Sequence, residues 1–247
     1  MSHNRAVARL ARFARLVKDA PLEDVREIMA NANELRRELN ELQRVGEDRL
    51  TLPPLESQQM RHPLGTDRSW RPEIWNTRLT PGAIAAAQNG APLGAELKVF
   101  HDCQDSELTL RQIRNTRAED LAPFGLRMDV FRFDGSFLSF ALDLPQMMID
   151  GLRLSHLVRL DLRVEFEKPL EMFARLNVKH GPNTEQIVRE IPLRGTTETW
   201  VEFDLAYTKM NEKRIESAWI DLIFEGPQMN QVILRDLNLS RHPRAEI

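Results

Sequence analysis

The rhythm of apolar residues changes near Leu93, and this change divides the chain of 247 residues. From there onward apolar and polar residues alternate, which is the period of a half-buried β-strand. In residues 158–166 (VRLDLRVEF) every second residue is Val, Leu or Phe, and the residues between them are charged. Ten short strands separated by turn residues predict an antiparallel jelly-roll β-sandwich over residues 93–247, with two layers that each keep one face in solvent. The other nine runs are 95–101, 107–113, 125–133, 136–144, 171–179, 185–193, 199–205, 218–225 and 230–239.

An N-terminal helical segment, residues 1–46, precedes this β region, because its apolar residues recur every three or four positions. Residues 5–18 carry five Arg and Lys residues on one side and Ala, Val, Leu and Phe on the other. A basic amphipathic helix of this kind either makes peripheral contact with an anionic membrane or an acidic partner, or packs on its own chain.

A second helix is predicted to begin at Pro21 and to run to about Gly46. Its apolar positions from Val25 to Leu42 follow a heptad spacing for about three repeats. This helix either pairs with its copy in a homo-oligomer or folds against the rest of the chain.

Residues 47–92 contain six prolines and show no sustained period, which predicts a linker or an arm that wraps around the β domain. Trp70 and Trp75 lie in this segment. They either offer a stacking platform to a ligand or pack into the side of the neighbouring domain.

Composition limits the classes of partner and the cellular compartment that we expect for the protein. With 34 basic and 37 acidic residues, no overall charge attracts it to nucleic acid, and the local basic runs lack interleaved aromatics. The single cysteine, Cys103, excludes an internal disulfide framework and favours a reducing compartment. No run is long and apolar enough for a transmembrane span or a signal peptide. We therefore expect a cytoplasmic protein, with contact to the inner membrane as an option.

Three stretches of the β region resemble galactose-binding-like jelly rolls, a group that includes many carbohydrate-binding modules. Residues 219–241 (WIDLIFEGPQMNQVILRDLNLSR) resemble their closing hairpin, residues 198–205 (ETWVEFDL) their Trp-led strand, and residues 93–103 (LGAELKVFHDC) their opening strand. The resemblance covers residues 93–241 and implies a β-sandwich with a glycan ligand.

The chain as a whole resembles an uncharacterised family of unknown function from Rhodobacter-type alphaproteobacteria. The resemblance is carried by HDCQDSELTLRQ (101–112), FDGSFLSFALDLP (133–145) and RLNVKHGPNTEQ (175–186). It implies no reaction.

The turn after residue 179 supplies the first candidate site. His180, Asn183 and Glu185 surround a Gly-Pro pair between two predicted strands, and we expect their side chains to project at the rim of the sandwich. They form a ligand site there, or the segment is only a turn.

A second cluster surrounds Cys103. Asp102 and Asp105 either hold a structural calcium ion or cap a turn. Cys103 is either a nucleophile that needs a histidine base or a small buried residue. The motifs of common metal, phosphate and dinucleotide sites are absent from the sequence, so we assign no catalytic residue.

These observations favour a non-catalytic binding module that recognises a glycan or a protein partner. Two alternatives stay open. One is a jelly-roll enzyme that acts on carbohydrates through two outward-facing carboxylates. The other is an assembly protein that oligomerises through the N-terminal helix.

Overall fold

The computed structural model describes residues 17, 20–51, 62–193 and 197–244. The chain forms two compact units, Met1–Leu52 and Pro53–Ile247. The basic segment 5–18 falls outside the described residues, apart from Val17.

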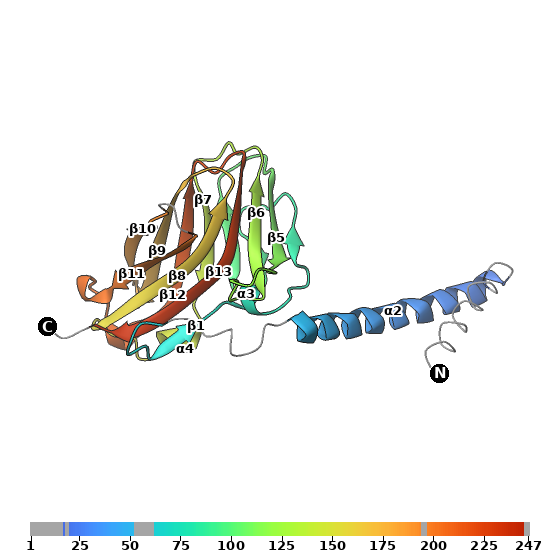
Figure 1. Cartoon of the computed structure of the whole chain (residues 1–247), viewed down its shortest axis with the longest axis horizontal. Helices are drawn as coiled ribbons and strands as arrows, with labels where there is room; N and C mark the ends of the chain where they lie inside the picture. The colour runs from blue at the N-terminus through green and yellow to red at the C-terminus, as the bar shows by residue number, and fades with distance from the viewer. Residues whose placement is uncertain (1–16, 18–19, 52–61, 194–196, 245–247) are drawn as a thin grey trace. The chain divides into compact units, whose positions relative to one another are not determined.

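The first unit contains a helix of 30 residues, α2 (Leu22–Thr51) (Figure 1). Glu23 and Asp24 lie in its first turn, where negative charge stabilises the helix N-terminus. The helix was expected to end near Gly46 but continues through it. A glycine inside a helix costs only about 1 kcal/mol, and Glu47, Arg49 and Leu50, which follow it, are good helix formers. Within the described part of the chain, no helix is both long and apolar enough to cross a bilayer.

The second unit is a sandwich of two antiparallel sheets (Figure 1). Short helices connect its strands: α3 (Glu73–Asn76), α4 (Gln146–Ile149) and the 3-10 turns Leu205–Tyr207 and Glu212–Arg214. In sheet A the order is β11 (Glu198–Asp204), β8 (His156–Phe166), β13 (Asn230–Pro243), β6 (Phe124–Val130), β5 (Leu108–Arg114) and β2 (Ala83–Ile84), and β1 (Arg68–Trp70) also pairs with β13. In sheet B the order is β10 (Asn183–Glu190), β9 (Glu171–His180), β12 (Ile215–Glu225), β7 (Leu138–Asp143), β4 (Leu97–His101) and β3 (Ala91–Leu93).

The fold class expected from the sequence is confirmed. Each of the ten predicted strands is present, as β4 to β13. Their apolar positions face inward and form one core between the sheets. Phe140 of β7 and Phe224 of β12 meet edge to face in that core, with ring centroids 4.9 Å apart.

The sandwich begins before Leu93. Residues 68–93 contribute β1, α3, β2 and β3 and pack on the body of the domain. Trp75 is fully buried, and its indole N–H donates to the Leu234 carbonyl at 3.0 Å. Strands of two or three residues are too short to show a period, which is why the sequence pattern placed the boundary too late.

Candidate functional site

The predicted rim residues lie at a tight turn. His180 and Asn183 are paired in the β9–β10 ladder, so only Gly181 and Pro182 join the two strands. Gly181 has φ +59°, which favours glycine. His180 was expected to project outward, but it is only 5% exposed. Its ring Nδ1 accepts from the Asn211 N–H at 3.3 Å.

The side chain of Glu185 also lies toward the interior at this end of the sandwich. It points to the same side as His180, with 3.7 Å between its carboxylate and the His180 Nε2. Its carboxylate accepts from the Lys209 N–H at 3.1 Å. Asn183 is exposed at the turn. The three residues therefore do not form one outward-facing group, because only Asn183 faces solvent.

The two tryptophans of the arm are both used in packing. Trp70 is partly buried against the core, and Trp75 lies inside it. Trp75 offers no face to a ligand in this structure, because its ring is enclosed and its N–H is already bonded.

The residues near Cys103 form a bonded loop. Asp102 accepts from the N–H groups of Ser136 and Phe137 and from the Ser136 hydroxyl. The hydrogen bond from Ser136 lowers the pKa of Asp102. Asp105 is exposed, and the described residues hold no group of three His, Cys, Asp or Glu side chains that could share a metal ion. Asp102 therefore caps a loop, and calcium binding by Asp102 and Asp105 stays a prediction.

Cys103 lacks the features of an activated nucleophile. Burial raises the pKa of its thiol, which keeps the thiol protonated. The nearby His101 is itself bonded to backbone groups: its Nδ1 accepts from the Cys103 N–H, and its Nε2 lies 2.8 Å from the Ala87 carbonyl.

Two hollows instead lie on the outer faces of the sheets. The first, here called the sheet-B furrow, has a volume of about 470 Å³ and is lined among others by Phe100, Phe137, Arg175, Gln186, Trp219 and Asp221. It exists because Ser139 and Ala141 point outward from the central strand β7 and are small. Larger side chains stand beside them on β4 and β12, at the positions paired with these two residues.

A hydrogen-bonded network fixes the polar side of the furrow. The amide of Asn177 is fully buried; its Nδ2 donates to Asp221 at 2.9 Å and its Oδ1 accepts from Gln186 at 2.9 Å. Arg175 lies directly opposite Asp221 on the neighbouring strand and donates to the same carboxylate oxygen through Nε at 2.9 Å. The Asp221 side chain is buried, whereas that of Arg175 is about one third exposed. Arg175 therefore holds a fixed orientation and presents its remaining N–H donors to the furrow.

Aromatic side chains lie beside this network. Trp219 projects outward next to Asn177, because its strand neighbours Ala218 and Ile220 face the core. Phe100 stands on the opposite wall, and Phe137 is 43% exposed. A fixed polar network next to partly exposed aromatic rings is typical of sites for polar ligands that have an apolar face.

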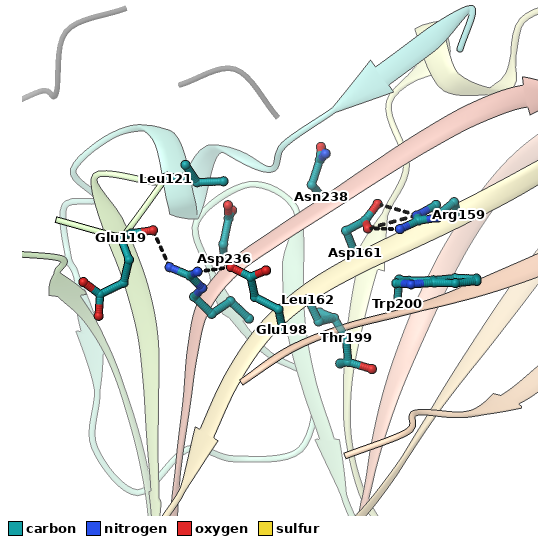
Figure 2. Close-up of a pocket in the computed structure, with 11 residues that line it drawn as sticks. Glu119, Leu121, Arg159, Asp161, Leu162, Glu198, Thr199, Trp200, Asp236 and Asn238 are labelled. Atoms are coloured by element: carbon teal, nitrogen blue, oxygen red, sulfur yellow. Dashed lines mark hydrogen bonds and ion pairs between the residues drawn. The ribbon is translucent and has the colours of Figure 1, made fainter. Parts of the chain in front are cut away.

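The second hollow, here called the sheet-A pocket, lies over β8, β11 and β13 and has a volume of about 760 Å³ (Figure 2). Asp161 and Arg159 come from β8, Trp200 from β11, and Asp236 and Asn238 from β13. Asp236 receives two hydrogen bonds from Arg71, at 2.9 and 2.8 Å. Burial raises the pKa of Asp236, although the charge and hydrogen bonds of Arg71 oppose that change.

None of the residues that line these two hollows was predicted as a site residue from the sequence. A signal was present at Trp219 and Phe100, which are aromatic residues at positions where the alternation calls for polar ones. Nothing in the sequence indicated that a furrow lies over Ser139 and Ala141, because small residues leave a hollow only when larger side chains lie on the neighbouring strands. The strand order of the sheet pairs strands that are distant in the chain.

Several solved structures are similar to this chain at low identity and low TM-score. A family 11 carbohydrate-binding module from Clostridium thermocellum, solved in complex with a β-1,3-1,4-mixed-linked tetrasaccharide, is 9% identical, with 67% of this chain and 98% of that chain covered and a TM-score of 0.37. The xylan-binding domain CBM22-1 of Paenibacillus barcinonensis Xyn10C is 10% identical, with 74% and 100% covered and a TM-score of 0.38. Tailspike protein 4 of bacteriophage CBA120 is 9% identical, with a TM-score of 0.42; 64% of this chain is covered, but only 21% of the tailspike chain.

A comparison with curated proteins gave no match. The model of one family, described as a family of unknown function (DUF6478), matches residues 1–247. The expected likeness to an uncharacterised family is confirmed, while its alphaproteobacterial origin stays a prediction. Because the match extends over the full length given, the chain belongs to the DUF6478 family of unknown function.

Proposed function

We propose that the second unit is a non-catalytic glycan-binding module and that the sheet-B furrow is its binding site. The observation that carries the proposal is the network of Arg175, Asp221, Asn177 and Gln186, fixed beside the outward ring of Trp219. A sugar ring has apolar C–H faces and a polar edge of hydroxyl groups. The furrow offers an aromatic surface to the first and oriented donors and acceptors to the second.

The network supports binding because its geometry exists before a ligand arrives. Asp221 is held by Asn177 and Arg175, so a sugar hydroxyl meets groups that need not be ordered at that moment. Such preorganisation reduces the entropic cost of association.

The carboxylate content of the furrow favours glycan binding without hydrolysis. Glycoside hydrolysis requires two carboxyl groups, about 5 to 10 Å apart, on either side of the scissile bond. Asp221 is the one acid among the described residues that line the furrow, and its carboxylate is paired with Arg175.

The test is a glycan array probed with the full chain, followed by calorimetric titration of the best oligosaccharide. Trp219→Ala is expected to weaken binding by about 30-fold, the effect of losing a central aromatic worth about 2 kcal/mol. Gln186→Ala should weaken it less, because one polar contact is removed and the aromatic wall stays. Trp200→Ala, on the other sheet, is the matched control and should bind as the parent does. An array without a ligand, or equal losses in Trp219→Ala and Trp200→Ala, contradicts the proposal.

A second function, assembly through α2, is supported by one observation on the first unit. Five large apolar side chains of this helix are between 50% and 75% exposed: Leu22, Met29, Leu35, Leu39 and Leu42. Three of them, Leu35, Leu39 and Leu42, belong to the heptad stripe found in the sequence, and exposed apolar residues on such a stripe favour pairing with another helix. We propose a second copy of the chain as the partner.

Sedimentation equilibrium of the full chain and of a chain that begins at Pro53 tests this second proposal. The full chain is expected to be a dimer or larger, and the shortened chain a monomer. Two monomers would refute the assembly role and leave the glycan proposal unaffected.

A further inference from the structure

The sheet-A pocket differs in its chemistry from the furrow on the other sheet. Its lining contains four carboxylates, those of Glu119, Asp161, Glu198 and Asp236, and two guanidinium groups, those of Arg159 and Arg163. Figure 2 shows the four carboxylates and Arg159 around the hollow. The pocket is therefore richer in hydrogen-bond acceptors than in donors.

Both arginines of the lining are already bonded. Arg159 donates through Nε to the Asp161 carboxylate at 2.9 Å, and its guanidinium lies 4.1 Å from the centroid of the Trp200 ring. Arg163 donates to the Glu119 carbonyl and to the Glu198 carboxylate. Both arginines of the pocket thus bond to other residues of its lining. Arg159 also covers one face of the Trp200 ring, on which a sugar would otherwise stack.

Asn238 is the unexplained group in this pocket. It is only 4% exposed, and its Oδ1 is buried without a hydrogen-bond partner. In Figure 2 its amide stands between Asp236 and Asp161 with no interaction drawn to it. A buried acceptor without a partner lowers stability, and such groups in folded proteins call for an explanation such as a missing ligand.

We propose that the sheet-A pocket binds an ammonium or guanidinium group, with Asn238 Oδ1 as a direct acceptor and the Asp161 carboxylate as the neighbouring charge. A cation supplies the donors that Asn238 lacks. The four carboxylates of the lining face three guanidinium groups, those of Arg159, Arg163 and the Arg71 bonded to Asp236, so the remaining negative charge favours a cation. The same chemistry is found in a lysine or arginine side chain of a partner protein and in a free polyamine. The site lies outside the sheet-B furrow, so it does not depend on glycan binding.

The first experiment is calorimetric titration of the full chain with three probes: N-acetyl-arginine amide, spermidine, and N-acetyl-glutamine amide as a neutral control. Saturable binding of a cationic probe that weakens as salt is added, with no binding of the neutral one, is expected. Stronger binding of the arginine derivative indicates a protein partner, and stronger binding of spermidine indicates a polyamine. Failure of both cations to bind, or equal binding of the neutral probe, overturns the proposal.

Two variants of one residue separate a binding role from a structural one. Asn238→Leu keeps the size of the side chain and removes the acceptor, so it should weaken cation binding at least 10-fold. The same variant should unfold at an equal or higher urea concentration than the parent, because the unpaired oxygen is gone. Asn238→Asp adds a negative charge and should tighten binding several-fold. If Asn238→Leu binds as the parent does, or unfolds at lower urea, Asn238 has a structural role and the assignment is wrong.

Discussion

Replacing Trp75 by alanine tests whether residues 68–93 belong to the sandwich core. The indole ring is fully buried, and its N–H donates to the Leu234 carbonyl of β13. Burial of about 200 Å² of aromatic surface at about 25 cal/mol per Å² corresponds to about 5 kcal/mol. Measured losses for buried Trp or Phe to alanine are about 3–5 kcal/mol. Trp75→Ala is therefore expected to remove about 4 kcal/mol of the free energy of unfolding, a large part of the about 5–15 kcal/mol typical of folded domains.

Urea unfolding followed by far-UV circular dichroism measures this loss. Trp200→Ala is the matched control, because Trp200 is 49% exposed and should cost less than about 1 kcal/mol. A chain that begins at Pro53 should unfold cooperatively, whereas one that begins at Leu93 lacks β1, β2 and Trp75 and should not. A loss below about 1 kcal/mol for Trp75→Ala would mean that the arm is not part of the core.

Two further predictions concern stability at other positions. Asp67 receives hydrogen bonds from Arg241, which is almost fully buried, and these bonds lower the pKa of Asp67. A lowered pKa stabilises the fold above the unfolded-state pKa of about 3.9, and this contribution is lost as the pH falls through the folded-state pKa. Asp67→Asn leaves the buried guanidinium of Arg241 without its anion, so it should cost about 1–3 kcal/mol at pH 7. It should also flatten the decline of stability in acid, as measured by urea unfolding at several pH values. Gly135→Ala should lower the free energy of unfolding by about 1–3 kcal/mol, because a Cβ there would lie 2.5 Å from the Asp102 carboxylate. Thermal unfolding measures this loss, and an unchanged melting temperature would show that the loop can move.

The strands were predictable because each one carries its own alternation. Residues 158–166 alternate without a break, and the structure has β8 there. The strands that were missed, β1 to β3, have two or three residues each. β3 pairs with β4, which follows it directly, whereas β1 and β2 are held by pairing with the distant strands β13 and β5. Pairing of that kind leaves no local pattern.

The candidate site was harder to predict for a related reason. His180 and Glu185 look like rim residues in sequence, but the tight turn at Gly181 and Pro182 directs both toward the interior. Arg175 and Asp221 alternate outward like any charged strand residues, and they become a network only because β9 and β12 are neighbours. The sequence therefore indicates which residues face outward, and strand order decides which of them meet.

The most direct test of the account is to locate a bound oligosaccharide on the protein. The measurement is the change of backbone amide chemical shifts in NMR spectra of the full chain during titration with the best ligand of the glycan array. The account predicts that the largest changes fall on Arg175, Gln186, Trp219 and their neighbours across β7, β9, β10 and β12. Changes confined to the turn at Asn183, or to the sheet-A pocket around Trp200, would contradict it.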